Sequence, residues 1–529
     1  MLTPVLLADL LAQSAERWPH ATALHIDGTS IAYAAVQEAV SAHAAGLLAL
    51  GLERADRVAI WLDKSPEMVI ACFGAAAAGG AFVPINPVLK PQQVAHVLAD
   101  SGARVLVTSA HRLALLAPCL AACGGLRHMV LTDDLPSGAE PRVAGILLHG
   151  WHALASAAAR PAHRVIDSDM VAILYTSGST GLPKGVVLSH RNLVAGAVSV
   201  VSYLGNHSGD TLLAALPLSF DAGFSQLTTA FHSGARVVLL NYLLPRDVLR
   251  TMASERVTGI TAVPPLYIQL ASLDWPAEIG ENLRYFANTG GHMPRETLAS
   301  LRRRVPRARP FLMYGLTEAF RSTYLPPDEV DRRPDSMGKA IPNAEILVLR
   351  EDGTPCAPDE PGELVHRGAL VSMGYWNDAE RTAERFRPLP ATAGPPLPEM
   401  AVYSGDTVRM DREGFLYFIG RRDEMIKSSG YRISPTEVEE ALYATGLVGE
   451  CAAFGVPHPV LGQAVHAVVT PSPPAALDTA QLLAACRAHM PAYMVPTQLH
   501  VMQSPLLRTP NGKIDRKRLA ASAEQQHEH

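Results

Sequence analysis

This chain lacks the patterns that would place it in several specialised classes of protein. Its six cysteines show no paired Cys-x-x-Cys spacing over 529 residues, so we expect reduced thiols and neither a disulfide framework nor a zinc site. No long block of one charge sign occurs and the formal net charge is −5, which argues against a nucleic-acid-binding protein. The longest apolar run, residues 71–85, contains three glycines and a proline and is too short to span a membrane.

The composition is that of a globular protein with sizeable cores. Hydrophobic residues make up 48% of the chain, and the length suggests roughly three to four domain-sized units. The first residues carry no basic segment before an apolar run and reach Asp9 early, so a signal peptide is not expected. We therefore expect a cytoplasmic protein.

From about residue 55, short aliphatic or β-branched runs alternate with helix-length segments rich in alanine and leucine. This alternation predicts an α/β fold with doubly wound parallel sheets, whose ligands bind beyond the carboxyl ends of the strands. The expected strands cover 58–62, 105–108, 171–175, 212–216, 237–240, 259–263 and 311–314.

The pattern changes to short strands and tight turns from about residue 340, which predicts a β-rich subdomain over about 340–422. A small α+β unit is expected from 423 to 529. Within it, Ser434-Pro-Thr-Glu437 is typical of a helix start, with an N-cap serine and a proline at the first helical position. Expected strands are 345–349, 363–366, 415–419, 451–456, 465–469 and 499–502, with a helix near 480–489.

A loop of small, hydroxyl-bearing residues runs from Tyr175 to Gly185 and reads Tyr-Thr-Ser-Gly-Ser-Thr-Gly-Leu-Pro-Lys-Gly. Glycines let backbone N–H groups approach phosphate oxygens, hydroxyls add donors, and Lys184 offsets negative charge. The loop is therefore a candidate polyphosphate cradle. It is not the Walker pattern, because Lys184 is followed by glycine instead of serine or threonine.

This loop resembles the signature loop of the AMP-forming ligase superfamily, which includes acyl-CoA synthetases, nonribosomal peptide adenylation domains and luciferases. Taken singly, the further motifs are also compatible with ordinary turns or helix starts. Together they follow the family's order, so the resemblance covers nearly the whole chain: Asn288-Thr-Gly-Gly291, Tyr314-Gly-Leu-Thr-Glu318, Tyr403-Ser-Gly-Asp406 and Thr509-Pro-Asn-Gly-Lys-Ile-Asp515. It implies a large N-terminal AMP-binding domain over 1–422 and a mobile C-terminal lid domain over 423–529.

The resemblance also implies ATP and Mg²⁺ as cofactors and a role for each motif. Tyr314 would stack on adenine, Asp406 and Arg421 would contact the ribose, and Thr317 would contact phosphate. The implied catalytic residues are Lys513, Thr176 and Glu318, of which Thr176 and Glu318 would hold magnesium through hard oxygen atoms. The other implied nucleotide-binding residues are Ser177, Gly178, Ser179, Thr180, Gly181, Lys184, Gly290, Gly291 and Gly315.

Two further implied features concern movement of the small domain. Asp423 lies where the family has its interdomain hinge, which allows one small domain to serve two half-reactions. Residues 427–431, Lys-Ser-Ser-Gly-Tyr, resemble the loop that lines the thiol tunnel in the second state. Lys513 would reach into the main site in the first state and stabilise charge on the α-phosphate and the attacking carboxylate.

The substrate residues point in two directions. Phe220-Asp221 is similar to amino-acid adenylation domains, in which the aspartate pairs with the substrate's α-amino group. Arg321, with Met313, falls in a stretch that lines the acyl pocket in the family. If Arg321 pairs with Asp221, the carboxylate is neutralised internally and the pocket accepts a plain acid. The combination resembles both free-standing prolyl-carrier-protein ligases and exosortase-associated acyl-CoA ligases.

We therefore expect an enzyme that activates a small-molecule carboxylic acid, in the first place an amino acid, to an acyl-AMP with release of pyrophosphate. No serine-centred carrier motif follows Lys513, so the expected acceptor is the phosphopantetheine thiol of CoA or of a free-standing acyl or peptidyl carrier protein. The alternatives are a fatty- or aryl-acid CoA ligase, an amide-forming ligase with an amine acceptor, and a luciferase-type enzyme. A non-catalytic nucleotide-binding protein would require loss of Lys513 or Glu318, and both are present.

Overall fold

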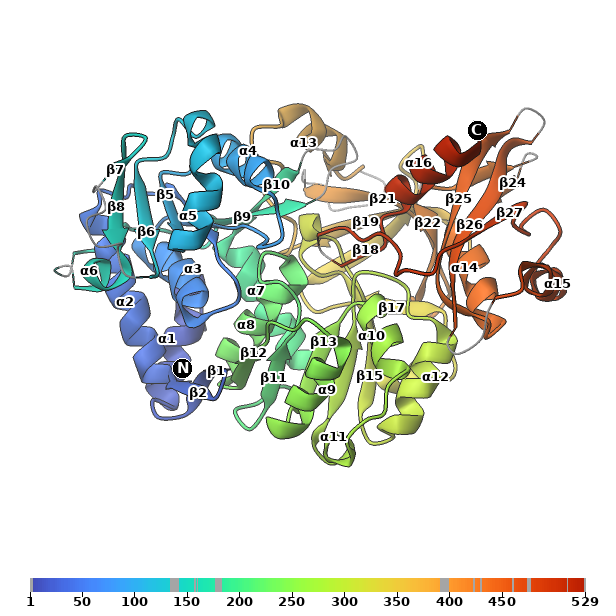
Figure 1. Ribbon diagram of the computed structural model, residues 1–529, viewed down its shortest axis with the longest axis horizontal. Helices are drawn as coiled ribbons and strands as arrows, with labels where there is room; N and C mark the ends of the chain where they lie inside the picture. Colours follow the sequence, from blue (N-terminus) through green and yellow to red (C-terminus); the bar gives the residue numbers. More distant parts are fainter. Residues whose placement is uncertain are drawn as a thin grey trace.

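The computed structural model describes residues 3–133, 142–156, 158, 160–176, 183–390, 399–421, 424–428, 431–458, 461–472, 477–510 and 512–527. The fold is mixed α/β, with two large sheets in the N-terminal part of the chain and a smaller sheet in the C-terminal part. The C-terminal unit, coloured orange to red in Figure 1, lies to one side of the larger body. This is the fold class that the sequence predicts.

The first sheet has the strand order β10-β9-β4-β3-β5-β6-β8-β7. Strands from β9 to β8 run parallel, and β10 and β7 add antiparallel edges. Its strands are β3 Arg57–Trp61, β4 Ala81–Pro84, β5 Val105–Thr108, β6 His128–Leu131, β7 Arg142–Val143, β8 Ile146–Gly150, β9 Met170–Thr176 and β10 Lys184–Ser189. The helices of this region are α1 Leu7–Arg17, α2 Tyr33–Ala49, α3 Pro66–Ala78, α4 Pro91–Ser101, α5 Ala110–Leu116 and α6 Trp151–Ala155.

The second sheet is longer and changes character along its width. Its order is β18-β19-β21-β22-β17-β16-β15-β14-β13-β11-β12-β1-β2, with β20 beside β21. Strands β1, β12, β11, β13, β14 and β15 run parallel to one another. From β15 onward each strand pairs antiparallel with the next, in the spatial order β16, β17, β22, β21, β19 and β18. The strands are β1 Thr22–Ile26, β2 Thr29–Ala32, β11 Thr211–Ala214, β12 Arg236–Leu239, β13 Gly259–Ala262, β14 Tyr285–Asn288, β15 Arg309–Tyr314, β16 Thr323–Leu325, β17 Ser336–Ala340, β18 Ala344–Leu349, β19 Gly362–Gly368, β20 Phe386–Pro388, β21 Met400–Met410 and β22 Leu416–Arg421.

The β-rich region that the sequence predicts from about residue 340 is thus continuous with the parallel sheet through the pairing of β17 with β22. The helices that pack around this sheet are α7 His190–Leu204, α8 Asp221–Ser233, α9 Pro245–Ser254, α10 Pro264–Ala271, α11 Ala277–Asn282, α12 Arg295–Arg304 and α13 Ala379–Arg385. Because the sheet's antiparallel part extends from its parallel part, β15, β21 and β22 bring their site residues to one region.

Helix α8 lies between the two sheets and carries one side of the site. Phe224 packs against Phe73 of α3 and Phe82 of β4, with ring centroids 5.9 and 4.8 Å apart, and Phe231 lies 5.0 Å from Phe73. Burial of each ring contributes about 1.5–3 kcal/mol. At Gly223, a Cβ atom would lie 1.8 Å from the Pro217 carbonyl oxygen, so only glycine allows this close approach of the helix to the preceding turn.

The C-terminal unit has the strand order β24-β23-β26-β25, with β27 beside β26. Its elements are β23 Ile426–Ser428, β24 Tyr431–Ile433, α14 Pro435–Ala444, β25 Val448–His458, β26 Gly462–Pro471, α15 Thr479–His489, β27 Gln498–Val501 and α16 Arg516–His527. Helix α14 begins at Pro435 as predicted, but the Ser434 hydroxyl makes no capping hydrogen bond. The fixed φ of proline therefore accounts for this helix start better than a serine cap does.

Each strand expected from the sequence overlaps a strand of the structure, and the helix expected near 480–489 is α15. Strand β10, which pairs antiparallel with β9, was not predicted. The described residues on either side of 177–182 therefore form an antiparallel pair of strands. Among the described helices, none combines the length and apolar character required to cross a bilayer.

Candidate functional site

Strands β9 and β10 hold the two ends of the predicted phosphate loop. Thr176 and Lys184 are paired in the register of this hairpin, so the loop begins and ends beside them. The Thr176 hydroxyl is buried and has no hydrogen-bond partner among the described residues. The predicted loop residues Ser177, Gly178, Ser179, Thr180 and Gly181 lie outside the described residues, and so does the predicted hinge residue Asp423.

Lys184, Glu318 and Tyr375 form a compact polar cluster. Lys184 Nζ donates to Glu318 Oε1 at 3.0 Å and to the Tyr375 hydroxyl at 2.7 Å, and that hydroxyl donates to Glu318 Oε1 at 2.6 Å. Burial alone would raise the pKa of Glu318, but the Lys184 charge and the Tyr375 hydrogen bond outweigh it and lower the pKa. Glu318 is thus an ionised, partly buried carboxylate whose partners are a cation and a hydroxyl.

Tyr375 was not among the residues predicted from the sequence. It follows Gly374 in the segment between β19 and α13, far along the chain from both of its partners. A lone tyrosine in a loop carries no local signal of this contact, so only the fold reveals it.

Tyr314, Asp406 and Arg421 form a second cluster at the junction of β15, β21 and β22. The Tyr314 hydroxyl donates to Asp406 Oδ2, and Arg421 Nε lies 3.4 Å from Asp406 Oδ1. Asp406 and Arg421 are direct neighbours in the β21–β22 register. Burial raises the pKa of Asp406, whereas the Arg421 charge and the Tyr314 hydrogen bond oppose that rise. A carboxylate held in this way offers acceptor oxygens to hydroxyl groups.

The Asn288–Gly291 turn lies beside Lys513 of the C-terminal unit. Asn288 Nδ2 donates to the Gly291 carbonyl oxygen at 2.9 Å. Gly290 has a φ of +78°, and a Cβ there would lie 3.1 Å from Lys513 Cε. A side chain at residue 290 would therefore strain the backbone and press against Lys513.

Gly315 and Thr317 sit in the tight segment between β15 and β16. A Cβ at Gly315 would lie 3.2 Å from Arg321 Cα, so the chain passes close to itself at this point. Thr317 is buried at the start of a single 3₁₀ turn that ends at Ala319. This turn sets Glu318 toward Lys184 and directs the chain back toward Arg321.

Lys513 enters the site from the C-terminal unit. Its loop is closed by hydrogen bonds from Thr509 N to the Lys513 carbonyl (2.7 Å) and from Gly512 N to the Thr509 carbonyl (2.9 Å). Asn86 Nδ2 of the N-terminal body donates to the Pro510 carbonyl at 2.8 Å. The Lys513 ammonium lies 5.9 Å from the centre of the Phe220 ring.

The electrostatic surroundings of Lys513 connect the predicted site residues. Desolvation by the surrounding protein lowers its pKa, and the charges of Asp221, Asp406 and Glu318 act in the opposite direction. These three carboxylates come from α8, β21 and the segment after β15. The structure therefore brings the predicted lysine to the same region as all three predicted carboxylates.

The predicted substrate residues Phe220 and Asp221 lie at the start of α8, and Arg321 lies between β15 and β16. Asp221 and Arg321 are 5% and 3% exposed. Burial raises the pKa of Asp221, and the charges of Arg321 and Lys513 oppose that rise. Arg321 Nη1 donates to Thr289 Oγ1 at 3.1 Å. Within the described part of the chain, Asp221 and Arg321 form no ion pair, and Asp221 Oδ1 has no hydrogen-bond partner. The internal pairing considered from the sequence is therefore not made.

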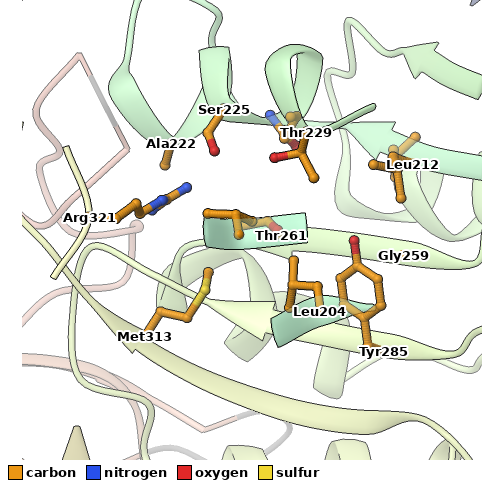
Figure 2. Close-up of a pocket in the computed structure, with 13 residues that line it drawn as sticks. Leu204, Leu212, Ala222, Ser225, Thr229, Gly259, Thr261, Tyr285, Met313 and Arg321 are labelled. Atoms are coloured by element: carbon orange, nitrogen blue, oxygen red, sulfur yellow. The ribbon is translucent and has the colours of Figure 1, made fainter. Parts of the chain in front are cut away.

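A narrow cavity extends from Arg321 between α8 and the second sheet (Figure 2). Ser225 and Thr229 of α8 line one side, and Thr261 and Met313 of the sheet line the other. The Tyr203 hydroxyl lies 3.1 Å from Met313 Sδ. Of the predicted substrate residues, the structure thus places Met313 and Arg321 in the wall of one cavity, with Phe220 and Asp221 at the adjacent helix start.

The oxygen atoms available in the site fit Mg²⁺. The buried Thr176 hydroxyl lacks a partner among the described residues, and Glu318 is an ionised carboxylate; both are hard donors of the kind magnesium takes in small numbers beside nucleotide phosphates and water. The described residues contain no cluster of three or more histidine, cysteine or acidic side chains suited to a metal. A magnesium ion here would thus depend on the nucleotide for most of its ligands.

Two family models match the chain, that of the AMP-binding enzymes over residues 11–376 and that of the AMP-binding enzyme C-terminal domain over 437–513. Feruloyl-CoA synthase from Amycolatopsis sp is 33% identical over 94% of both chains. L-proline–[L-prolyl-carrier protein] ligase from Pseudomonas fluorescens is 30% identical over 98% of this chain and 99% of the relative.

A linear gramicidin synthase protein from Brevibacillus parabrevis is 30% identical over 96% of this chain, which spans only 6% of that much longer relative. Among solved structures, o-succinylbenzoate-CoA synthetase from Bacillus subtilis, in complex with ATP and magnesium, has a TM-score of 0.79 and 27% identity over 96% of this chain and 98% of the other.

Proposed function

The chain belongs to the AMP-binding enzyme family, and on that basis we propose that it uses ATP and Mg²⁺ to convert an amino acid to an aminoacyl-AMP. The acyl group then passes to the phosphopantetheine thiol of CoA or of a free-standing carrier protein. In this proposal residues 1–422 form the catalytic body and 423–529 form a lid that turns about Asp423. The observation that carries the proposal is the position of Lys513, a residue of the C-terminal unit that lies against Gly290 and is influenced by Asp221, Asp406 and Glu318.

In the first half-reaction, a substrate carboxylate oxygen forms a bond to the α-phosphorus, and the bond from that phosphorus to the pyrophosphate oxygen breaks. Both reacting groups are negatively charged, so the site must supply positive charge. Lys513 supplies it between the acid end of the site and the nucleotide end. A bound magnesium would neutralise phosphate charge, held by Glu318 and Thr176. Lys184, now paired with Glu318, is placed to exchange that partner for a phosphate oxygen.

The remaining assignments follow the two other clusters. Asp406 and Arg421 bind the ribose, and Tyr314 stacks on adenine while its hydroxyl holds Asp406 in place. Gly290, Gly291 and Gly315 allow backbone to approach the adenylate, and Thr317 with Ser177, Gly178, Ser179, Thr180 and Gly181 contacts phosphate. In the second half-reaction the thiol attacks the acyl carbon and AMP leaves.

Asp221 supports an amino acid as the substrate. It is a buried carboxylate with one oxygen that has no partner among the described residues, and a substrate ammonium is the group that would satisfy it. One relative, L-proline–[L-prolyl-carrier protein] ligase, is named for an amino acid. The likeness to feruloyl-CoA synthase supports a second candidate function, CoA ligation of an aryl acid. An amide-forming ligase shares the same first step and differs in its acceptor.

The experiment is pyrophosphate release across amino acids, fatty acids and aryl acids, with hydroxylamine present to trap the adenylate. We expect hydroxamate from a few amino acids, followed by thioester formation with CoA or a carrier protein. Asp221→Ala should lower kcat/KM for amino acids selectively. An equal loss with plain acids would contradict the role of Asp221, and a response confined to aryl acids would favour the second candidate.

A further inference from the structure

The polar residues of α8 divide into two groups according to the side of the helix on which they lie. Thr228 and Ser233 donate to backbone carbonyls of their own helix, at 3.3 Å to Ser225 and 2.9 Å to Thr229. Ser225 and Thr229, one helical turn apart, line the cavity, and their hydroxyls have no partner among the described residues. Helical serine and threonine ordinarily satisfy themselves by bonding back to the preceding turn. The side of α8 that faces the cavity therefore carries hydroxyl groups without hydrogen-bond partners among the described residues.

Gln226 continues this pattern. Its Nε2 donates to the Gly223 carbonyl at 3.0 Å, which fixes the amide, but its Oε1 is buried in the cavity wall without a partner in the described part of the chain. Ser225, Gln226 and Thr229 are each less than a tenth exposed. Buried polar atoms are normally hydrogen-bonded, because leaving them unpaired costs stability. A cluster of such atoms around one cavity points to a ligand with matching groups.

Arg321 gives this cluster its charge. Figure 2 shows its side chain reaching into the cavity across from Ser225. The guanidinium is buried and donates through Nη1 to Thr289, whereas its Nε has no partner among the described residues. A buried arginine without a carboxylate in contact is costly unless another acceptor reaches it. Arg321 is therefore positioned to donate to an oxygen of the ligand.

The cavity is also small. The volume that the centre of a water molecule can occupy is about 10 Å³, which is room for roughly one water making about three hydrogen bonds. A water with about three hydrogen bonds would leave at least one of four atoms unpaired. In the described structure these unpartnered atoms belong to Ser225, Gln226, Thr229 and Arg321. A long alkyl chain would require the wall to rearrange and would leave these atoms unpaired.

We propose that this cavity selects a short acid whose side chain ends in an oxygen acceptor, which Arg321 holds while the α8 hydroxyls complete its hydrogen bonds. The inference rests on the proposed function, since it names the class of acid that the enzyme activates. Carboxylate, amide and hydroxyl oxygens share the required chemistry. Unsubstituted aliphatic acids do not have it, because they offer Arg321 no acceptor.

The test compares acids of nearly the same shape in the hydroxylamine-trapped assay. Aspartate and asparagine are compared with leucine, threonine is compared with valine, and octanoate tests chain length. We expect the oxygen-bearing acid of at least one pair to have a kcat/KM at least about tenfold above that of its apolar match. The pair that shows this difference identifies whether the cavity binds a carboxylate, an amide or a hydroxyl group. Equal or higher values for leucine, valine or octanoate would overturn the inference while leaving adenylation intact. Absence of hydroxamate and pyrophosphate with every class of acid would instead overturn the proposed function, and this inference with it.

Two variants assign the selectivity to the cavity. Arg321→Met keeps a long side chain and removes a buried charge, a change that folded proteins often tolerate. It should raise the KM for the preferred acid at least about tenfold without altering the KM for ATP, and should reduce the discrimination within the pair. Arg295→Met, at an exposed surface ion pair, is the matched control. A uniform loss with both acids of the pair would contradict the inference.

Thr229→Val removes a cavity hydroxyl at nearly constant volume, and Thr228→Val removes one on the same helix that does not line the cavity. We expect Thr229→Val, and not Thr228→Val, to lower kcat/KM for the oxygen-bearing acid. Equal effects of the two substitutions would indicate a role in helix stability alone and would contradict a substrate contact.

Discussion

The Lys513 side chain passes close to Gly290 at the boundary between the C-terminal unit and the N-terminal body. A Cβ at residue 290 would lie 3.1 Å from Lys513 Cε, and the backbone there has a φ of +78°. The absence of a side chain at Gly290 thus makes room for the side chain of Lys513, the proposed catalytic residue. Activity should therefore be sensitive to a change at either residue.

Gly290→Ala should displace Lys513 and place alanine in left-handed backbone geometry, at a cost of about 1 kcal/mol in stability. We expect adenylation to fall by about 100-fold, because small misplacements of catalytic groups have effects of that size. The measurement is the trapped hydroxamate rate. Gly280→Ala is the control, because its Cβ would meet only the Arg304 carbonyl at 3.8 Å. Retention of full activity in Gly290→Ala would show that Lys513 does not need this approach.

Tyr375→Phe removes the hydroxyl that Lys184 and Glu318 share. The hydrogen bond from the Tyr375 hydroxyl to Glu318 helps to lower the pKa of Glu318, so its loss should raise that pKa. Activity that requires ionised Glu318 should then begin to fall at a higher pH than in the wild type. The measurement is the acid limb of kcat/KM for MgATP. Tyr417→Phe, which loses a similar bond to Asp411 at 3.1 Å, should leave this limb unchanged; a matching shift in both variants would contradict the assignment.

Glu440→Gln should weaken the contact that holds the C-terminal unit in the present position, because Glu440 Oε1 lies 2.6 Å from His292 Nε2 of the N-terminal body. Single ion pairs at partly exposed sites contribute little, so we expect a decrease of about two- to fivefold in adenylation. Thioester formation from preformed acyl-AMP should not decrease, since in the proposed lid movement that step uses another position of the C-terminal unit. Glu384→Gln, at an exposed residue of α13, serves as the control. An equal decrease in both half-reactions would contradict a lid effect.

Asp221→Asn should change the pH dependence of stability. Burial raises the pKa of Asp221 in the folded protein above its ordinary 3.8. At a pH between the ordinary pKa and the raised pKa, the folded protein therefore holds a proton that the unfolded chain has released. Stability therefore falls as pH rises through this window. The variant lacks this loss, and its Tm should exceed that of the wild type at about pH 7 by more than at about pH 4. Scanning calorimetry measures both; a Tm difference independent of pH would contradict a raised pKa.

The sequence predicted the fold class because most parallel strands of the two large sheets are short, mostly apolar runs. It indicated the site motifs because each of them is local. Tyr314 and Glu318 flank one strand end, and Thr176 and Lys184 close one hairpin. Such residues are adjacent through backbone geometry alone, so short patterns suffice to place them together.

Contacts between segments that are distant in the chain could not be predicted as well from the sequence. Arg321 was considered as a partner of Asp221, but its guanidinium donates to Thr289 on another turn. Tyr375 and the unpartnered hydroxyls of Ser225 and Thr229 have no sequence signal, because serine and threonine in a helix usually bond to their own backbone. Their significance depends on which side of α8 faces the cavity, and that is decided by the packing of Phe224 between the sheets.

The most direct test of the account is the ATP-dependent formation of acyl hydroxamate by wild-type protein and Lys513→Ala, with Lys517→Ala as a control in the exposed part of α16. We predict that Lys513→Ala loses at least about 100-fold in rate, as expected for a preorganised charge at a reacting phosphate, with an unchanged Tm. Lys517→Ala should match the wild type. Full activity of Lys513→Ala would contradict the central claim that this lysine completes the adenylation site.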